Sequence, residues 1–165
     1  MMSRILIAVS LLHASIALAA DVPTLQGRVN DYAGILQPKV REQLESSLAR
    51  YERETTHQIA ILTVSSLGGE PIEAFSLRLA RAWALGRKGL DSGVLVTVVS
   101  NDHAVRIELG DGINRYVSDS DAKRIIDEAM IPAFREGHFD IGLKLGLERL
   151  FEVCRAYKIN SEMTK

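Results

Sequence analysis

Hydrophobic residues recur along this chain at one spacing that is typical of helices and another that is typical of strands. Apolar side chains three and four residues apart predict amphipathic helices over residues 38–54, 71–85 and 139–157, and another that begins after Ser118 and is kinked or restarted at Pro132. Continuous runs rich in valine and isoleucine predict two buried strands, Gln58–Ser65 and Val94–Val99. Alternating apolar residues over 105–109 predict a further strand with one exposed face.

The order of these elements predicts the fold class. A strand, a helix and a second buried strand imply a parallel pair joined by a right-handed crossover. The turn signal Asn101-Asp102 then predicts a hairpin to the third strand. With helices before and after covering both faces, we expect an α/β fold, a three-layer α/β/α sandwich around a small mixed sheet. Residues 20–158 form the predicted single domain, residues 21–36 are expected to be irregular, and residues 159–165 are expected to be a frayed tail.

The first residues have the pattern of an export signal. Arg4 precedes an almost entirely apolar stretch, Ile5–Leu18, and Ala17-Leu18-Ala19 is a small-x-small cleavage signal. The apolar stretch is short for a membrane span of about 20 residues, although an uncleaved anchor is the alternative. We therefore predict a signal peptide over residues 1–19, a secreted product, a bacterial periplasm as the compartment, and no transmembrane segment in the mature chain.

Charge and cysteine content narrow the range of partners. The chain holds 20 Lys and Arg against 21 Asp and Glu, a net charge of −1, which gives no reason to expect nucleic acid as a partner. The single cysteine, Cys154, lies among apolar residues and is expected to be a buried structural thiol. Three separated histidines and one cysteine in the mature chain make a zinc site a poor expectation.

The loop Gly86–Gly93 is the segment most suggestive of function, because it joins a helix to a buried strand and holds Asp91. Asp31 and Asp119 also lie in loops beside the end of a strand or helix. Calcium takes six to eight oxygen ligands from carboxylates and backbone carbonyls, which loops of this kind can supply. We expect Asp31, Asp91 and Asp119 as metal ligands, with calcium as the ion and magnesium as a possibility. The alternative is that all three are turn and helix-cap residues.

Other residues near this loop are candidates for shaping a cleft. Arg87 and Lys88 offer positive charge for a phosphate or an acidic partner, or they belong to a solvated turn. Arg106 and Glu108 share a strand face and are expected to form an ion pair at the cleft edge. The remaining candidates are glycines of the loop and of the tight turn that ends the third strand: Gly93, Gly110 and Gly112.

Several of these segments, taken in order, resemble the TPM domain family. The resemblance covers almost all of residues 20–165, and its motifs are Val22-Pro23 with Leu25, Val29–Leu36, Thr55–Ala60, Trp83 with Gly86–Leu95, Val105–Gly112, and Ser118-Asp119 through Gly137. It implies a secreted, periplasmic or lumenal α/β/α domain that supports membrane complexes. Some members are described as calcium-binding or as weak acid phosphatases.

This sequence also departs from the family pattern. Ile113-Asn114 follows the Gly-x-Gly turn where many members have Leu-Glu, which removes a carboxylate from that loop and weakens a metal or phosphatase interpretation of it. Many bacterial relatives also carry a C-terminal membrane helix and a glycine-rich tail, which this sequence does not contain.

Three hypotheses for function remain. The leading one is a secreted accessory domain that binds a divalent cation in a loop cleft and supports an envelope or membrane protein complex. The second is a weak metal-assisted acid phosphatase (a phosphomonoesterase), in which Asp31 and Asp91 hold the ion and Arg87 or Lys88 contacts phosphate. The third is a ligand-free protein-binding module. No local serine, cysteine and histidine pattern points to nucleophilic catalysis, so no catalytic residue is assigned.

Overall fold

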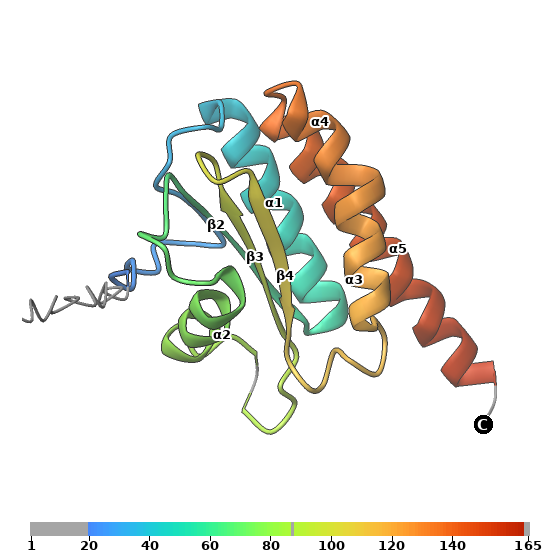
Figure 1. The fold of residues 1–165 in the computed structure, drawn as a ribbon. Helices are drawn as coiled ribbons and strands as arrows, with labels where there is room; N and C mark the ends of the chain where they lie inside the picture. Colours follow the sequence, from blue (N-terminus) through green and yellow to red (C-terminus); the bar gives the residue numbers. More distant parts are fainter. Residues whose placement is uncertain (1–19, 87, 164–165) are drawn as a thin grey trace, which may run out of the picture.

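The computed structural model describes residues 20–86 and 88–163, with side chains as far as residue 155. The predicted signal peptide at residues 1–19 and the candidate Arg87 therefore lie outside the described residues. In chain order the elements are β1 (Val29–Asp31), α1 (Pro38–Thr55), β2 (Gln58–Val64), α2 (Ile72–Ala82), β3 (Gly93–Val99), β4 (Ala104–Leu109), α3 (Asp119–Ile125), the π-helix η1 (Ile126–Met130), α4 (Ile131–Arg135) and α5 (Phe139–Met163) (Figure 1).

The four strands form one mixed sheet in the order β1-β2-β3-β4. Strands β1, β2 and β3 run parallel, and β4 returns antiparallel beside β3, so both the parallel pair and the hairpin predicted from the sequence are confirmed. Strand β1 was not predicted, because its three residues are too few to show a period. It nevertheless pairs with β2 in register, Asn30 opposite Leu62, and forms one edge of the sheet.

The two faces of the sheet are covered unequally. Figure 1 shows α1, α3 and α5 on one face and α2 alone on the other, which makes the three layers of an α/β/α sandwich. Alternate strand residues point to each side, because successive side chains of a strand face opposite ways. The strand residues buried in the larger core are Val29, Ile59, Ile61, Val94, Val96, Val98 and Ile107. Those buried under α2 are Ala60, Leu62, Leu95 and Val99.

The helical C-terminal half differs in detail from the sequence prediction. At Pro132 the expected kink takes the form of a π-helical turn, η1, followed by α4. Ser118 and Asp121 complete a capping box at α3, although glutamate is the usual partner; the hydrogen bond from the Ser118 hydroxyl lowers the pKa of Asp121. Helix α5 ends at Met163 rather than near Tyr157.

Cys154 is 4% exposed among the apolar residues of the larger core, as predicted. Burial raises the pKa of its thiol, which keeps the group protonated and unreactive at neutral pH. Within the described part of the chain, no helix combines the length and apolar character needed to cross a membrane.

Because α2 is the only helix on this sheet face in the described part of the chain, its buried side chains are expected to be important for stability. Replacing Phe75 (1% exposed) with alanine should lower the free energy of unfolding by about 3–5 kcal/mol, since it removes a buried ring and leaves a cavity. Leu77 on the same helix is 40% exposed, and Leu77→Ala should change it by less than about 0.5 kcal/mol. Urea unfolding of both variants tests this, and equal losses would contradict the assignment of α2 as a cover.

Candidate functional site

The loop before β3 and the turn after β4 are in direct backbone contact. Gly110 donates its N–H to the carbonyl of Gly93 at 2.8 Å, and Gly112 donates to the carbonyl of Asp91 at 3.1 Å. A Cβ atom at Gly110 would lie 2.3 Å from the Asp91 carbonyl oxygen, and one at Gly112 would lie 1.8 Å from the carbonyl oxygen of Leu90. Both distances are far below contact, so only glycine lets these two segments approach so closely.

The segment after α2, at Leu85 and Gly86, approaches the same junction from the other side. A Cβ at Gly93 would lie 2.5 Å from the Leu85 carbonyl, and one at Gly86 would lie 2.8 Å from the Gly93 nitrogen. Gly86 also has a positive φ of 102° and donates its N–H to the side chain of Gln58 at 2.8 Å. Asp91 has the left-handed φ of 44°, which is uncommon for a residue other than glycine. Three segments are thus fixed against one another, and Asp91 is held in their centre.

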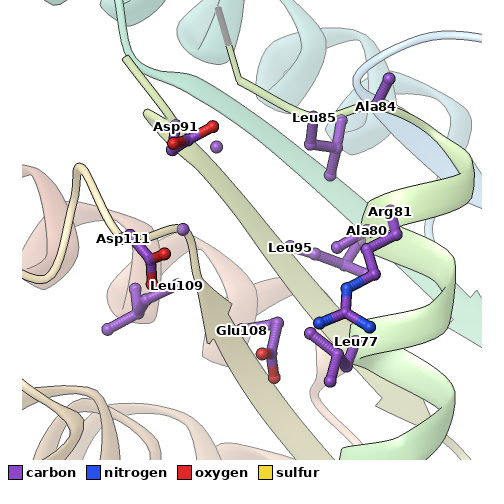
Figure 2. A pocket seen from close by; sticks show the side chains of 12 residues that line it. Leu77, Ala80, Arg81, Ala84, Leu85, Asp91, Leu95, Glu108, Leu109 and Asp111 are labelled. Atoms are coloured by element: carbon purple, nitrogen blue, oxygen red, sulfur yellow. The ribbon is translucent and has the colours of Figure 1, made fainter. Parts of the chain in front are cut away.

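A pocket of about 320 Å³ opens beside this junction, between α2 and the adjacent face of β3 and β4. Figure 2 shows Asp91 and Asp111 on the loop side of the pocket, with Arg81 reaching in from α2 opposite them. Glu108 lines the same pocket further along β4. The other lining residues are Leu77, Ala80, Ala84, Leu85, Gly93, Leu95, Leu109 and Gly110.

The charged groups of the pocket differ in how far they are already engaged. Glu108 pairs with Arg106, whose Nε lies 2.7 Å from a carboxylate oxygen, so the predicted same-face ion pair is confirmed. The carboxylates of Asp91 and Asp111 form no hydrogen bond or ion pair with another described residue, and the same holds for the guanidinium of Arg81. The carboxylates of Asp91 and Asp111 and the guanidinium of Arg81 are therefore available to a ligand.

Asp31 lies at the opposite end of the sheet from this pocket. It is the last residue of β1 and lies opposite Thr63, which pairs in turn with Val98 near the end of β3. Asp91 precedes the start of β3, and the strand between them spans roughly 16 Å. The Asp31 carboxylate also accepts hydrogen bonds from the backbone N–H groups of Ile35 and Leu36 and from the Thr63 hydroxyl, so it fixes the turn after β1.

Asp119 lies in a third place. It is the first residue of α3 and borders a groove beside β4 with Arg106 and Lys123. Among the described residues, no three Asp, Glu, His or Cys side chains are gathered closely enough to hold one metal ion. The structure therefore does not bring Asp31, Asp91 and Asp119 together, because Asp31 ends β1, Asp91 precedes β3 at the opposite end of the sheet, and Asp119 begins α3.

Most of the predicted cleft residues lie in or beside the pocket, unlike the three predicted metal ligands. Gly93, Glu108 and Gly110 line the pocket, Gly112 packs beneath it, and Lys88 is exposed on the adjoining loop.

Two pocket residues, Arg81 and Asp111, were not predicted from the sequence. Arg81 is an ordinary polar position of an amphipathic helix, and Asp111 was interpreted only as part of a tight turn. The one sequence signal for Asp111 was its position between Gly110 and Gly112, the two glycines whose backbone contacts hold it beside Asp91.

The glycine contacts predict a large cost for a single methyl group. Gly112→Ala should lower the free energy of unfolding by about 3 kcal/mol, because its Cβ would collide with a carbonyl that cannot move without breaking the junction. Gly137 has a φ of 78° with open space around it, so Gly137→Ala should cost only the conformational penalty of about 1 kcal/mol. Thermal or urea unfolding measures both, and an equal loss in the two variants would rule out the collision.

Comparison with known proteins agrees with this architecture. The model of the TPM domain family matches residues 29–153. The solution structure of the N-terminal domain of a P. gingivalis protein is 35% identical, with a TM-score of 0.75 over 81% of this chain and 88% of that one.

Two further solution structures share the fold at lower identity. The BA42 protein of the psychrophilic bacterium Bizionia argentinensis is 23% identical, with a TM-score of 0.64 over 74% of this chain and 83% of that one. The N-terminal domain of the cg2496 protein of Corynebacterium glutamicum is 16% identical, with a TM-score of 0.59 over 85% of each chain. No curated protein matches this chain. On the family match over most of its length, the chain belongs to the TPM domain family.

Proposed function

We propose that this TPM domain is a non-catalytic accessory domain that binds a divalent cation, calcium in the first place, in the pocket between α2, β3 and β4. The observation that supports this proposal is the pair of unengaged carboxylates, Asp91 and Asp111, which line one pocket from two loops fixed by glycine contacts. A rigid junction lowers the entropic cost of gathering ligands from separate loops. Asp31 and Asp119 are not part of this proposed site.

The chemistry of these ligands sets the expected affinity. Calcium takes six to eight oxygens, so backbone carbonyls and water would complete the shell around the two carboxylates. A site with so few charged ligands belongs with extracellular calcium modules, whose dissociation constants are about 0.1–1 mM. Magnesium keeps several of its waters and can use one or two carboxylates, so we expect it to compete.

Among the described residues, the lining of the pocket holds no hydroxyl, thiol or imidazole group that could act as a nucleophile. Ser92, the nearest hydroxyl in the chain to Asp91, donates to the carbonyl of Thr56 at 3.3 Å and is buried. This composition favours binding over turnover.

Apolar exposure beside the pocket supports a protein partner. Leu90 is 53% exposed on the loop that carries Asp91, and Leu77 is 40% exposed at the pocket wall. Exposed large side chains around a charged pocket are typical of a contact surface. Together with the export signal predicted at residues 1–19, this leads us to propose an envelope or membrane protein complex facing the bacterial periplasm as the partner.

Calcium titration of residues 20–165, which contain both hydrophobic cores, tests the proposed site. For the unmodified chain, calorimetry is expected to give a calcium dissociation constant of about 0.1–1 mM. Calcium at 100 times that constant should raise the free energy of unfolding by about 2.7 kcal/mol. Asp91→Asn and Asp111→Asn should each weaken binding at least tenfold, because each removes one of two charged ligands. Asp119→Asn, the same change at an aspartate outside the pocket, should leave binding unchanged.

Two results would contradict this site. One is the absence of any response to calcium, magnesium or manganese. The other is a loss of binding in Asp119→Asn as large as that in Asp91→Asn. Either result would indicate that Asp91 and Asp111 are only turn residues. It would favour the third hypothesis, a protein-binding module that needs no ligand.

Arg81 favours one alternative function, a metal-assisted phosphomonoesterase. Its unpaired guanidinium faces the carboxylates across the pocket, where it could bind a phosphate group while Asp91 and Asp111 hold the ion. A bound metal would supply a water of lowered pKa as the nucleophile.

Hydrolysis of an aryl phosphate with calcium or magnesium separates the two functions. The accessory proposal predicts the same negligible rate for the unmodified chain, Asp91→Asn and Arg81→Gln. Metal-dependent turnover that both variants abolish would establish the phosphatase instead. Leu77→Ala serves as the control, because it alters the pocket wall without removing a charged group.

A further inference from the structure

Strand β4 forms an open edge of the sheet, and its hydrogen-bonding phase can be assigned. Gly110 donates to the carbonyl of Gly93, so this pair is a hydrogen-bonded one. Hydrogen-bonded and non-hydrogen-bonded pairs alternate along an antiparallel ladder, which places the N–H and C=O groups of Arg106 and Glu108 toward β3. The residues whose N–H and C=O groups point outward are Val105, Ile107 and Leu109.

This outward side is accessible and unpartnered in the described part of the chain. No hydrogen bond joins the outward N–H and C=O groups to another described residue. A groove of about 390 Å³ follows β4 between the start of α2 and the exposed side of α3, and it is lined by Val105, Arg106 and Ile107 of the strand. Unpaired strand edges of this kind are templates for another strand.

The other edge of the sheet is protected. Strand β1 has three residues, and the N–H of Val29 is taken by a carboxylate oxygen of Glu45 at 2.8 Å. Short edge strands and capped backbone groups are the usual means of preventing edge pairing. The two edges therefore differ, and only β4 offers a run of free backbone groups.

We propose that β4 pairs with β4 of a second copy of this chain, antiparallel and centred on Ile107. In this register Ile107 lies opposite its own copy and Val105 opposite Leu109, so all the outward backbone groups meet outward groups. Arg106 of each copy then lies opposite Glu108 of the other. The side chains of such a non-hydrogen-bonded pair are closest, with Cα atoms about 4.5 Å apart.

The charges select this register over its neighbours. A shift in one direction that keeps the hydrogen-bonding phase places Arg106 opposite Arg106, and a shift in the other direction places Glu108 opposite Glu108. Like charges directly opposite each other destabilise a strand pair. A shift by a single residue would place the outward N–H and C=O groups of one copy opposite residues whose N–H and C=O groups are already bonded to β3. The sequence of β4 is thus complementary to itself in one register.

This inference goes beyond the proposed cation site and does not depend on it. The pairing uses the outer side of β4, whereas the pocket lies on the face of β3 and β4 toward α2. It is measured without added cations, so its failure and the failure of cation binding are distinguishable.

Sedimentation equilibrium of residues 20–165 from micromolar to millimolar concentration tests the dimer. We expect a reversible monomer–dimer equilibrium. Arg106→Glu and Glu108→Arg should each raise the dimer dissociation constant roughly tenfold or more, because both charge pairs become repulsive. The double exchange Arg106→Glu with Glu108→Arg restores opposite charges and should restore the dimer. Arg149→Glu, an exposed charge reversal on α5, should have no effect.

The same exchanges disturb the ion pair within one copy, so thermal melting at the lowest concentration checks that each variant is folded. A chain that stays monomeric at every concentration would overturn the proposal. That result would hold even if β4 binds an extended segment of another protein instead of a second copy. A dimer unaffected by either single reversal would also overturn it, by placing the interface elsewhere.

Disulfide crosslinking tests the register itself. A mixture of Arg106→Cys and Glu108→Cys chains should crosslink on oxidation, because the opposed Cα distance of about 4.5 Å lies within the disulfide range. Each variant alone should crosslink far less. Cys154 is buried and should not take part. Equal crosslinking in the separate variants would contradict pairing centred on Ile107.

Discussion

The backbone contact among the segment after α2, the start of β3 and the turn after β4 is the constraint on which the site depends. Glycine at positions 86, 93, 110 and 112 lets carbonyl and amide groups of these segments touch where any Cβ would collide. The hydrogen bonds from Gly110 and Gly112 then fix the turn after β4 to the loop before β3. Asp91 is held in a left-handed conformation between them, so contacts between backbone segments fix the loop side of the pocket.

Unequal covering of the sheet determines where function can reside. The face under α1, α3 and α5 is filled by the larger core, whereas α2 covers the other face alone. This single helix leaves Glu108 and Arg106 partly exposed on β4. The pocket lies at the margin of α2, and the free backbone edge lies just beyond it. Both features therefore lie on or beside the face that α2 alone covers among the described helices.

Long periodic segments made most of the fold predictable from sequence. The buried runs that became β2 and β3 and the alternation that became β4 specified a parallel pair and a hairpin. Strand β1 could not be found this way, because three residues carry no period and its pairing with β2 is a tertiary effect. The capping box of α3 formed with Asp121, which shows that a shorter carboxylate side chain also reaches the cap nitrogen.

The site was less predictable, because sequence proximity to a strand does not specify which end of the sheet a residue reaches. Asp31 and Asp91 both lie at strand ends, yet Asp31 is the last residue of β1 and Asp91 precedes the amino end of β3. Burial and hydrogen bonding further separate them, since Asp31 is engaged by its own turn. Asp111 and Arg81 join the pocket only through the fold.

Paramagnetic broadening of backbone amide signals by manganese tests the central claim most directly, that Asp91 and Asp111 form one cation site. Broadening decays steeply with distance, so it locates the ion without any substitution. We expect substoichiometric manganese to remove the amide signals of residues 90–93 and 110–112 first, and added calcium to restore them. Broadening centred on residues 31–36 or 118–121, or spread evenly over the acidic surface, would contradict it.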